Sequence, residues 1–177
     1  MKTIEGLGVI VSAGVCCGKT YLGQHYKTVL DLESTPYNYI LTEEQKLLDN
    51  EQLKGTKKEL NPNFLDDYYL AIKDAVLKYD VVLVAPGKKI RAMLQEKKLD
   101  YIVAYPDENC LEEYIGRAKN RGNNESFVER MKNGMIPEGM TTDIYATKHI
   151  VLHSGEYLEN ALLKEHLISK QDKVLNR

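Results

Sequence analysis

One stretch near the beginning of the chain constrains the fold more than any other. Residues 9–20 read VIVSAGVCCGKT, which predicts a buried apolar strand, a turn containing glycine and the start of a helix. Residues 13–20 match the pattern of a phosphate-binding loop, with Ala13 in place of the usual first glycine. Because the match has the strand before it and the helix after it that the pattern requires, we interpret it as a nucleoside-triphosphate site rather than a chance octapeptide.

The residue types in this loop fit the chemistry of phosphate binding. Small residues let backbone N–H groups curl around a phosphate, and the N-terminus of the following helix adds a partial positive charge. We expect Lys19 to place its charge on the outer phosphates and the Thr20 hydroxyl to ligate Mg²⁺. The expected ATP-binding residues are those of the loop and the residue after it: Ala13, Gly14, Val15, Cys16, Cys17, Gly18, Lys19, Thr20 and Tyr21.

Two of the three cysteines lie inside this loop. The odd number of cysteines and the lack of a framework spacing indicate free thiols in a reducing compartment. We interpret Cys16 and Cys17 as small residues that fit the turn. The alternative is an oxidation-sensitive switch, because thiols beside a helix N-terminus tend to have a lowered pKa.

The composition is that of a single soluble domain. The chain has 177 residues, of which 43% are hydrophobic and 28% charged, with a net charge of −2. A pI near 6.1 gives no global attraction to nucleic acid or to an anionic membrane. No apolar run approaches the length of a membrane span. We therefore expect one domain over residues 1–177 that is cytoplasmic, monomeric or homodimeric, and without a nucleic-acid or membrane partner.

Alternating apolar runs and amphipathic stretches predict the rest of the fold. Thr42 and Gln45 form a capping box, and Asn61-Pro62 marks another helix start. We expect a polar loop at 54–59 and a tail that frays from Gln171. Since strands alternate with helices, the strands should be parallel, which gives a three-layer α/β/α sandwich with a five-stranded sheet. Beyond the first strand, the expected strands are 28–32, 81–85, 101–105 and 149–152, and the expected helices are 20–26, 42–55, 61–80, 86–98, 107–121, 124–133 and 156–170.

Arginines gather in the segment after the fourth expected strand. Arg117 and Arg121 are four residues apart on one expected helix, so both should point the same way, and Arg130 follows on the next helix. We interpret them as phosphate clamps in a lid-like segment, residues 107–135, that closes over the site and excludes water. The alternative is a solvated face whose arginines pair with nearby acids: Glu112, Glu113 and Glu125.

The order of these features resembles that of the P-loop kinases. The phosphate loop is followed by Asp-x-Glu after the second strand and by Arg-x-x-x-Arg-Gly after the fourth. Residues 105–122 are similar to the lid-bearing helix of the nucleoside monophosphate kinase-like superfamily, which includes adenylate, thymidylate, shikimate and gluconate kinases. The chain also resembles small kinases encoded by phages. The resemblance covers nearly the whole chain in order of elements and implies a sheet order of 2-3-1-4-5.

The resemblance also implies roles for residues outside the loop. Asp31 would join Thr20 at Mg²⁺, and Glu33 would contact the acceptor, although both acids could instead cap a turn. One departure is Ala85-Pro86-Gly87, which stands where many P-loop enzymes have a magnesium-binding aspartate after the third strand. Either Asp31 takes over that duty or the metal site is weak. The implied catalytic residues are Lys19, Asp31, Glu33, Arg117 and Arg121, and the implied acceptor-binding residues are Glu33, Lys88, Arg91 and Arg130.

Two classes of acceptor fit the residues. A phosphate acceptor needs no general base, whereas a hydroxyl acceptor benefits from a carboxylate within reach of its proton. A basic cluster (Lys88, Arg91, Arg117 and Arg121) favours a nucleoside monophosphate, and this is our expectation, slightly ahead of the alternative. The acids Asp31 and Glu33 favour a hydroxyl on a nucleoside or small metabolite. An ATP-binding switch without transfer is a further alternative, favoured by Ala13 and by the missing aspartate.

Overall fold

Five parallel strands form the central sheet of the computed structural model, which describes residues 6–48, 50–53 and 56–174. The sheet order is β2-β5-β1-β6-β7, and every neighbouring pair is parallel. The first strand of the chain therefore lies in the centre, and its carboxyl end leads into the phosphate loop. The bounds are Val9–Ala13 for β1, Val29–Asp31 for β2, Val81–Val84 for β5, Tyr101–Pro106 for β6 and Lys148–Leu152 for β7.

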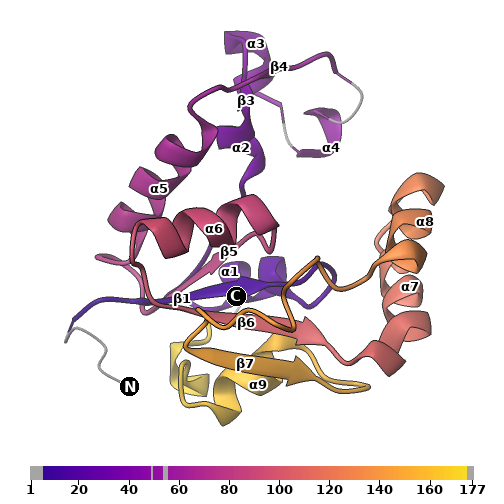
Figure 1. Ribbon diagram of the computed structural model, residues 1–177. Helices are drawn as coiled ribbons and strands as arrows, with labels where there is room; N and C mark the ends of the chain where they lie inside the picture. The colour runs from indigo at the N-terminus through magenta and orange to yellow at the C-terminus, as the bar shows by residue number, and fades with distance from the viewer. Residues whose placement is uncertain (1–5, 49, 54–55, 175–177) are drawn as a thin grey trace.

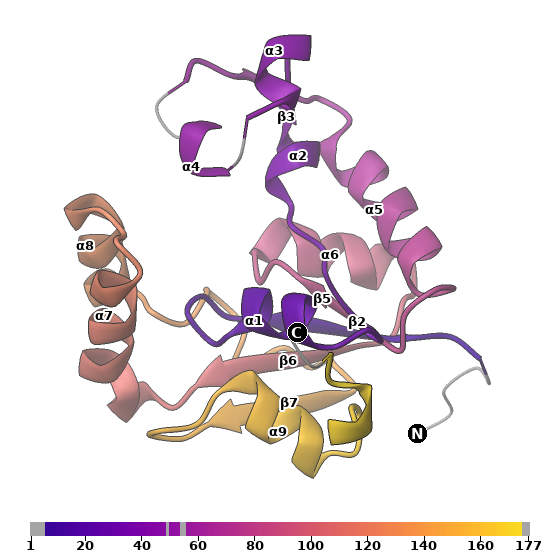
Figure 2. The same ribbon diagram turned by 180° about the vertical axis from the view of Figure 1, so that it is seen from behind.

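Helices cover both faces of this sheet (Figures 1 and 2). α1 (Lys19–His25) and α9 (Leu158–Lys164) lie on one face, and α5 (Phe64–Ala75) and α6 (Lys88–Glu96) on the other. Neighbouring residues of one strand pack into different hydrophobic cores, one on each face of the sheet, because successive side chains point to opposite faces. Val11 packs with the α1 and α9 side, whereas Ile10 packs with the α5 and α6 side. The expected α/β class and the three-layer arrangement are confirmed.

A pair of helices stands beyond the carboxyl ends of the strands (Figure 1). α7 (Leu111–Asn120) follows a short 3₁₀ turn, η1 (Glu108–Cys110), and α8 (Glu125–Asn133) follows α7. The Asp107 side chain accepts a hydrogen bond from the Asn109 N–H at 2.9 Å, and Asn124 caps α8 through the Phe127 N–H. Gly122, at a φ of 75°, takes the left-handed conformation that ends α7. α8 lies where the sequence predicts it, whereas the helix expected over 107–121 begins with the 3₁₀ turn η1 and becomes α-helical only at Leu111.

A small module projects from the α5 side of the sheet (Figure 1). Its capping box is confirmed, since Thr42 Oγ1 accepts from the Gln45 N–H at 3.2 Å. The expected helix over 42–55 is wrong, however, because Leu47 ends the first turn with 87% of its surface exposed and has no core to continue into. Part of the expected loop also forms a strand. The module contains α2 (Thr35–Asn38), β3 (Tyr39–Ile40), α3 (Glu43–Lys46), α4 (Asn50–Leu53) and β4 (Glu59–Leu60), with β3 and β4 antiparallel, while Lys54 and Gly55 lie outside the described residues.

The last expected helix is shorter than its sequence pattern indicates. α9 ends at Lys164, because His166 takes a positive φ of 55° and turns the chain away. After η2 (Lys170–Asp172), the chain docks on the end of α1, where Val174 N–H donates to His25 O at 2.7 Å. The expectation that the tail frays from Gln171 is therefore wrong as far as Val174, and residues 175–177 lie outside the described part.

The start of α5 also differs from the sequence prediction. α5 begins at Phe64 rather than at Asn61-Pro62, because the Asn61 side chain accepts from the Asn63 N–H and holds this stretch in a turn. Within the described residues, no helix is both long and apolar enough to cross a membrane.

Candidate functional site

The loop between β1 and α1 has the backbone of a tight anion-binding turn. Gly18 at the N-cap of α1 has a φ of 101°, and Cys16 has a φ of 55°. A Cβ on Gly18 would also approach the Tyr157 ring to 3.3 Å, so glycine is required here on two grounds. The N-cap residue Gly18 has no side chain that could cap α1. The N-terminus of this helix therefore opens into the loop.

The Lys19 side chain folds back across the loop. Its Nζ donates to Ala13 O at 2.9 Å and to Gly14 O at 2.8 Å. These carbonyls hold the ammonium group at the mouth of the turn, beside the N-terminus of α1. Phosphate oxygens placed there would meet a lysine charge and backbone N–H groups together.

The two loop cysteines are packed into the core. Cys17 is 1% exposed and its Sγ donates to Gly14 O, while Cys16 is 6% exposed. Burial raises the pKa of both thiols, and the nearby charges of Arg121 and Lys19 only partly oppose this effect. The position beside a helix N-terminus therefore does not produce thiolates. This supports the interpretation of both cysteines as small packing residues and gives no support to the oxidation switch.

Thr20 and Asp31 are brought together by close packing of α1 against β2. A Cβ on Gly23 would lie 2.9 Å from the Asp31 Cβ, so only glycine allows this approach. The Thr20 hydroxyl donates to Asp31 Oδ2 at 3.2 Å. Burial raises the pKa of Asp31, and the Lys19 charge opposes that shift. The pair brings two hard oxygen atoms together beside the loop.

These two residues fit a magnesium ion held jointly with nucleotide phosphates. Mg²⁺ usually keeps several waters and takes only one or two protein carboxylates in such sites. No group of three or more His, Cys, Asp or Glu side chains suited to a metal occurs in the described part of the chain. Thr20 and Asp31 would therefore supply a minority of the ligands.

A cleft of about 240 Å³ opens beside the loop. The expected residues Lys19, Thr20, Glu33 and Arg121 all line it. Arg121 is the C-cap of α7, and its exposed side chain reaches the loop from the other wall. The further lining residues are Val15, Cys16, Cys17, Gly18, Ala85, Pro86, Asn123 and Phe127.

Asn123 and Phe127 are site residues that the sequence analysis missed. The available signal was Gly122, because a chain that turns at the end of α7 can return the next residues toward the loop. The structure places them on the same cleft wall as Arg121.

Arg117 holds structural elements together instead of facing the cleft. Its guanidinium bonds to the Glu113 carboxylate and donates to Glu156 O at 2.8 Å, and its side chain is 10% exposed. It also lies 3.9 Å from the Tyr157 ring centroid and 4.4 Å from that of Tyr114. Arg121 remains in helical register with Arg117, since its N–H donates to Arg117 O at 3.1 Å, and the Arg117 guanidinium donates to Cys16 O in the loop at 3.5 Å. Of the two arginines only Arg121 lines the cleft, because Glu113 and Glu156 occupy the guanidinium of Arg117.

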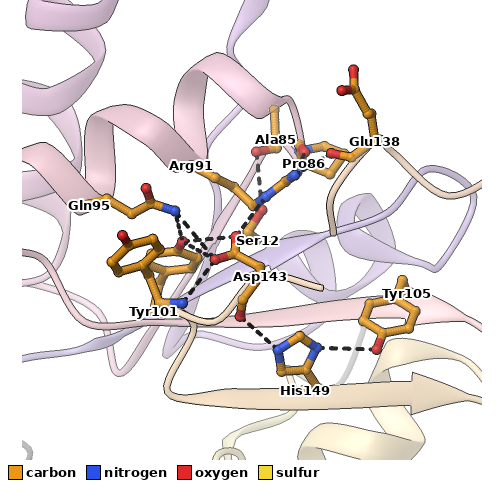
Figure 3. Close-up of polar contacts among 11 residues, drawn as sticks. Ser12, Ala85, Pro86, Arg91, Gln95, Tyr101, Tyr105, Glu138, Asp143 and His149 are labelled. Carbon is orange, nitrogen blue, oxygen red and sulfur yellow. Dashed lines mark hydrogen bonds and ion pairs between the residues drawn. The ribbon is translucent and has the colours of Figure 1, made fainter. Parts of the chain in front are cut away.

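Arg91 belongs to a buried polar network on the α6 face of the sheet (Figure 3). Its side chain is 4% exposed, and Nε donates to Asp143 Oδ2 at 2.9 Å. The guanidinium also bonds to Pro86 O and donates to Glu138 O at 2.6 Å. Asp143 accepts further bonds from Tyr101 and Gln95. An acceptor cannot reach this guanidinium, so we do not retain an acceptor-binding role for Arg91.

Further expected residues outside the cleft lining are Ala13, Gly14, Tyr21, Asp31, Lys88 and Arg130. Lys88 forms an exposed ion pair with Glu138 at 2.7 Å. Arg130 is exposed on α8, with its guanidinium 5.6 Å from the Phe127 ring centroid. The Tyr21 ring stacks on His25 with centroids 4.0 Å apart, because the two residues are one helical turn apart on α1.

The chain matches no protein-family model, and no curated protein sequence matches it. The interpretation of the cleft therefore depends on its own geometry.

Proposed function

We propose that this protein is a magnesium- and ATP-dependent phosphotransferase of the P-loop kinase type. The observation that carries the proposal is the Lys19 ammonium, held across the loop by Ala13 O and Gly14 O beside the uncapped start of α1. The strand order supports it as well. Counted along the chain, the strands of the central sheet stand in the order 2-3-1-4-5, the order that the resemblance implies.

The residues around the cleft fit distinct parts of phosphoryl transfer. Lys19 and the loop N–H groups bind and orient the triphosphate, and Arg121 neutralises charge on the group being transferred. Thr20 and Asp31 hold a magnesium ion, which spreads the phosphate charge when bound. Asn123 and Phe127 cover the cleft from the α7–α8 side and restrict water.

The structure changes the balance between the two acceptor classes. Of the four basic residues that favoured a nucleoside monophosphate, only Arg121 lines the cleft. Glu33 lines it as well, is exposed, and its carboxylate makes no hydrogen bond or ion pair within the described residues. A free carboxylate repels a phosphate dianion but accepts the proton of a hydroxyl. A hydroxyl acceptor therefore fits the cleft best, and a nucleoside monophosphate is the second candidate, favoured by Arg121.

The test is ADP formation from Mg-ATP with a panel of acceptors. The panel contains nucleosides, shikimate, gluconate, and ribo- and deoxynucleoside monophosphates, with Lys19→Ala as the blank. We expect stimulation by a hydroxyl compound that Glu33→Gln reduces by about a hundredfold, the lower range of a general-base effect. Stimulation by a monophosphate that Glu33→Gln leaves intact supports the second candidate. ATP binding without turnover across the panel supports the switch instead.

A further inference from the structure

The hydrogen-bond ladder between β2 and β5 ends one hydrogen bond earlier than the regular parallel pattern allows. Asp31 pairs with Leu83, and the Leu32 N–H still donates to Leu83 O at 2.9 Å. In a regular parallel ladder, a residue that donates to one residue of the neighbouring strand accepts from the residue two positions further on. The next bond would therefore join the Ala85 N–H to Leu32 O.

The Tyr68 hydroxyl occupies the place of that bond. It donates to Leu32 O at 2.7 Å and accepts from the Ala85 N–H at 3.4 Å. Tyr68 is fully buried on α5, and its ring lies between those of Tyr37 and Phe64, with centroid distances of 5.3 and 5.8 Å. The ring cannot swing away, so one phenol oxygen stands permanently between the two strand ends.

The two strand ends that Tyr68 separates carry one side of the cleft. Leu32 lies between Asp31 and Glu33, and Ala85 itself lines the cleft with Pro86. We propose that Tyr68 is a positioning residue whose hydroxyl prevents the sheet from closing one bond further. It thereby sets the separation of the Asp31–Glu33 segment from Ala85. The identity of the ligand in this gap rests on the proposed function, whereas the spacing role does not.

Loss of the Tyr68 hydroxyl allows Leu32 O and the Ala85 N–H to form a hydrogen bond with each other. Tyr68→Phe removes the shared partner of Leu32 O and the Ala85 N–H in a partly buried gap, which favours a direct bond between the two groups. That bond draws the segment after β2 toward β5 and moves Asp31 relative to Thr20. Changes in residues that orient metal ligands typically lower metal affinity about 10–100-fold.

The experiment compares Tyr68→Phe with two matched variants. Tyr101→Phe also removes a buried, bonded hydroxyl, but one that contacts Asp143 away from the cleft. Tyr114→Phe removes a buried hydroxyl that has no hydrogen-bond partner among the residues that the structure describes. ATP affinity is measured without metal, Mn²⁺ affinity is measured on the ATP complex by electron paramagnetic resonance, and exchange of the Ala85 amide is followed by NMR.

We expect Tyr68→Phe to weaken Mn²⁺ binding about tenfold while ATP affinity without metal stays unchanged. Both control variants should keep the wild-type affinities, and Tyr68→Phe alone should change Ala85 exchange. Equal Mn²⁺ affinities in Tyr68→Phe and Tyr101→Phe would overturn the proposal, as would a Tyr68→Phe protein that unfolds or loses ATP and Mn²⁺ alike.

Ala85 exchange in the wild-type protein needs neither a variant nor a ligand. An amide that exchanges as fast as in an unfolded peptide overturns the inference by itself. A wild-type protein that binds no ATP but protects Ala85 contradicts the proposed function and supports the spacing role of Tyr68. The two failures can therefore be told apart.

Discussion

The phosphate-loop cleft and the buried network around Arg91 are built from the same residue types, yet they behave oppositely. In the network, Arg91 and Tyr101 both donate to Asp143, Arg91 also donates to backbone carbonyls, and all three side chains are buried (Figure 3). In the cleft, Arg121 and Glu33 are exposed. The difference is that the fold encloses the guanidinium of Arg91, whereas the exposed guanidinium of Arg121 can meet a ligand.

Mutations in the two regions should therefore change different measured properties. Breaking a buried ion pair leaves an uncompensated charge in the core and affects the free energy of unfolding. Removing an exposed side chain away from such features changes stability by no more than about 0.5 kcal/mol. In the cleft, the same removal should appear in turnover.

The largest expected effect on stability is that of Arg91→Met. We expect it to lower the free energy of unfolding by roughly 3–5 kcal/mol, because Asp143 is left buried and unpaired. Urea denaturation measures this change. The double variant Arg91→Met/Asp143→Leu removes both charges and should recover much of the loss. A single variant as stable as the wild type would contradict the distinction between the two regions.

Arg121→Ala should have the next largest effect, on turnover instead of stability. Loss of a group that neutralises transferring charge typically lowers the catalytic rate at least about a hundredfold. The melting temperature should stay near that of the wild type, and so should ATP affinity. Lys119→Ala, on the same helix and outside the cleft lining, is the matched control. A large fall in melting temperature without a change in turnover would show that Arg121, like Arg91, has a structural role.

The smallest effect is expected at Glu113, whose carboxylate accepts a hydrogen bond from Arg117. Glu113 is half-buried, so its exposure lies between that of the Arg91 network and that of the exposed cleft residues. Hydrogen bonds from the Gly155 N–H, Ser154 and Arg117 lower the pKa of Glu113 below its ordinary 4.5. The stability from these bonds is therefore present above pH 4.5 and is lost as the pH falls through the lowered pKa.

Glu113→Gln should lower the melting temperature by about 2 °C at neutral pH, as expected for a modest stability change in a chain of this size. The difference from the wild type should shrink as the pH falls below 4.5, which thermal melts over a pH series can follow. A difference that grows with acidity would reverse the sign assigned to Glu113.

The sequence predicts features whose cause is local. The strands follow from continuous apolar runs, the loop from its spacing, and α3 and α8 from their capping residues. It does not predict features that depend on a distant partner. The pairing of Arg91 with Asp143 and the Tyr68 bond to Leu32 join segments remote in sequence, so neither leaves a pattern in the neighbouring residues. Similarly, β3 and β4 are too short for alternation to be detected.

The contacts around α1 link the phosphate loop to segments that are made much later in synthesis. The Leu158 N–H donates to Cys17 O inside the phosphate loop, and the Val174 N–H donates to His25 O at the end of α1. A ribosome completes the loop sequence well before it makes either partner. We therefore expect the loop of a nascent chain to reach its final shape only after α9 and the segment up to Val174 have left the exit tunnel.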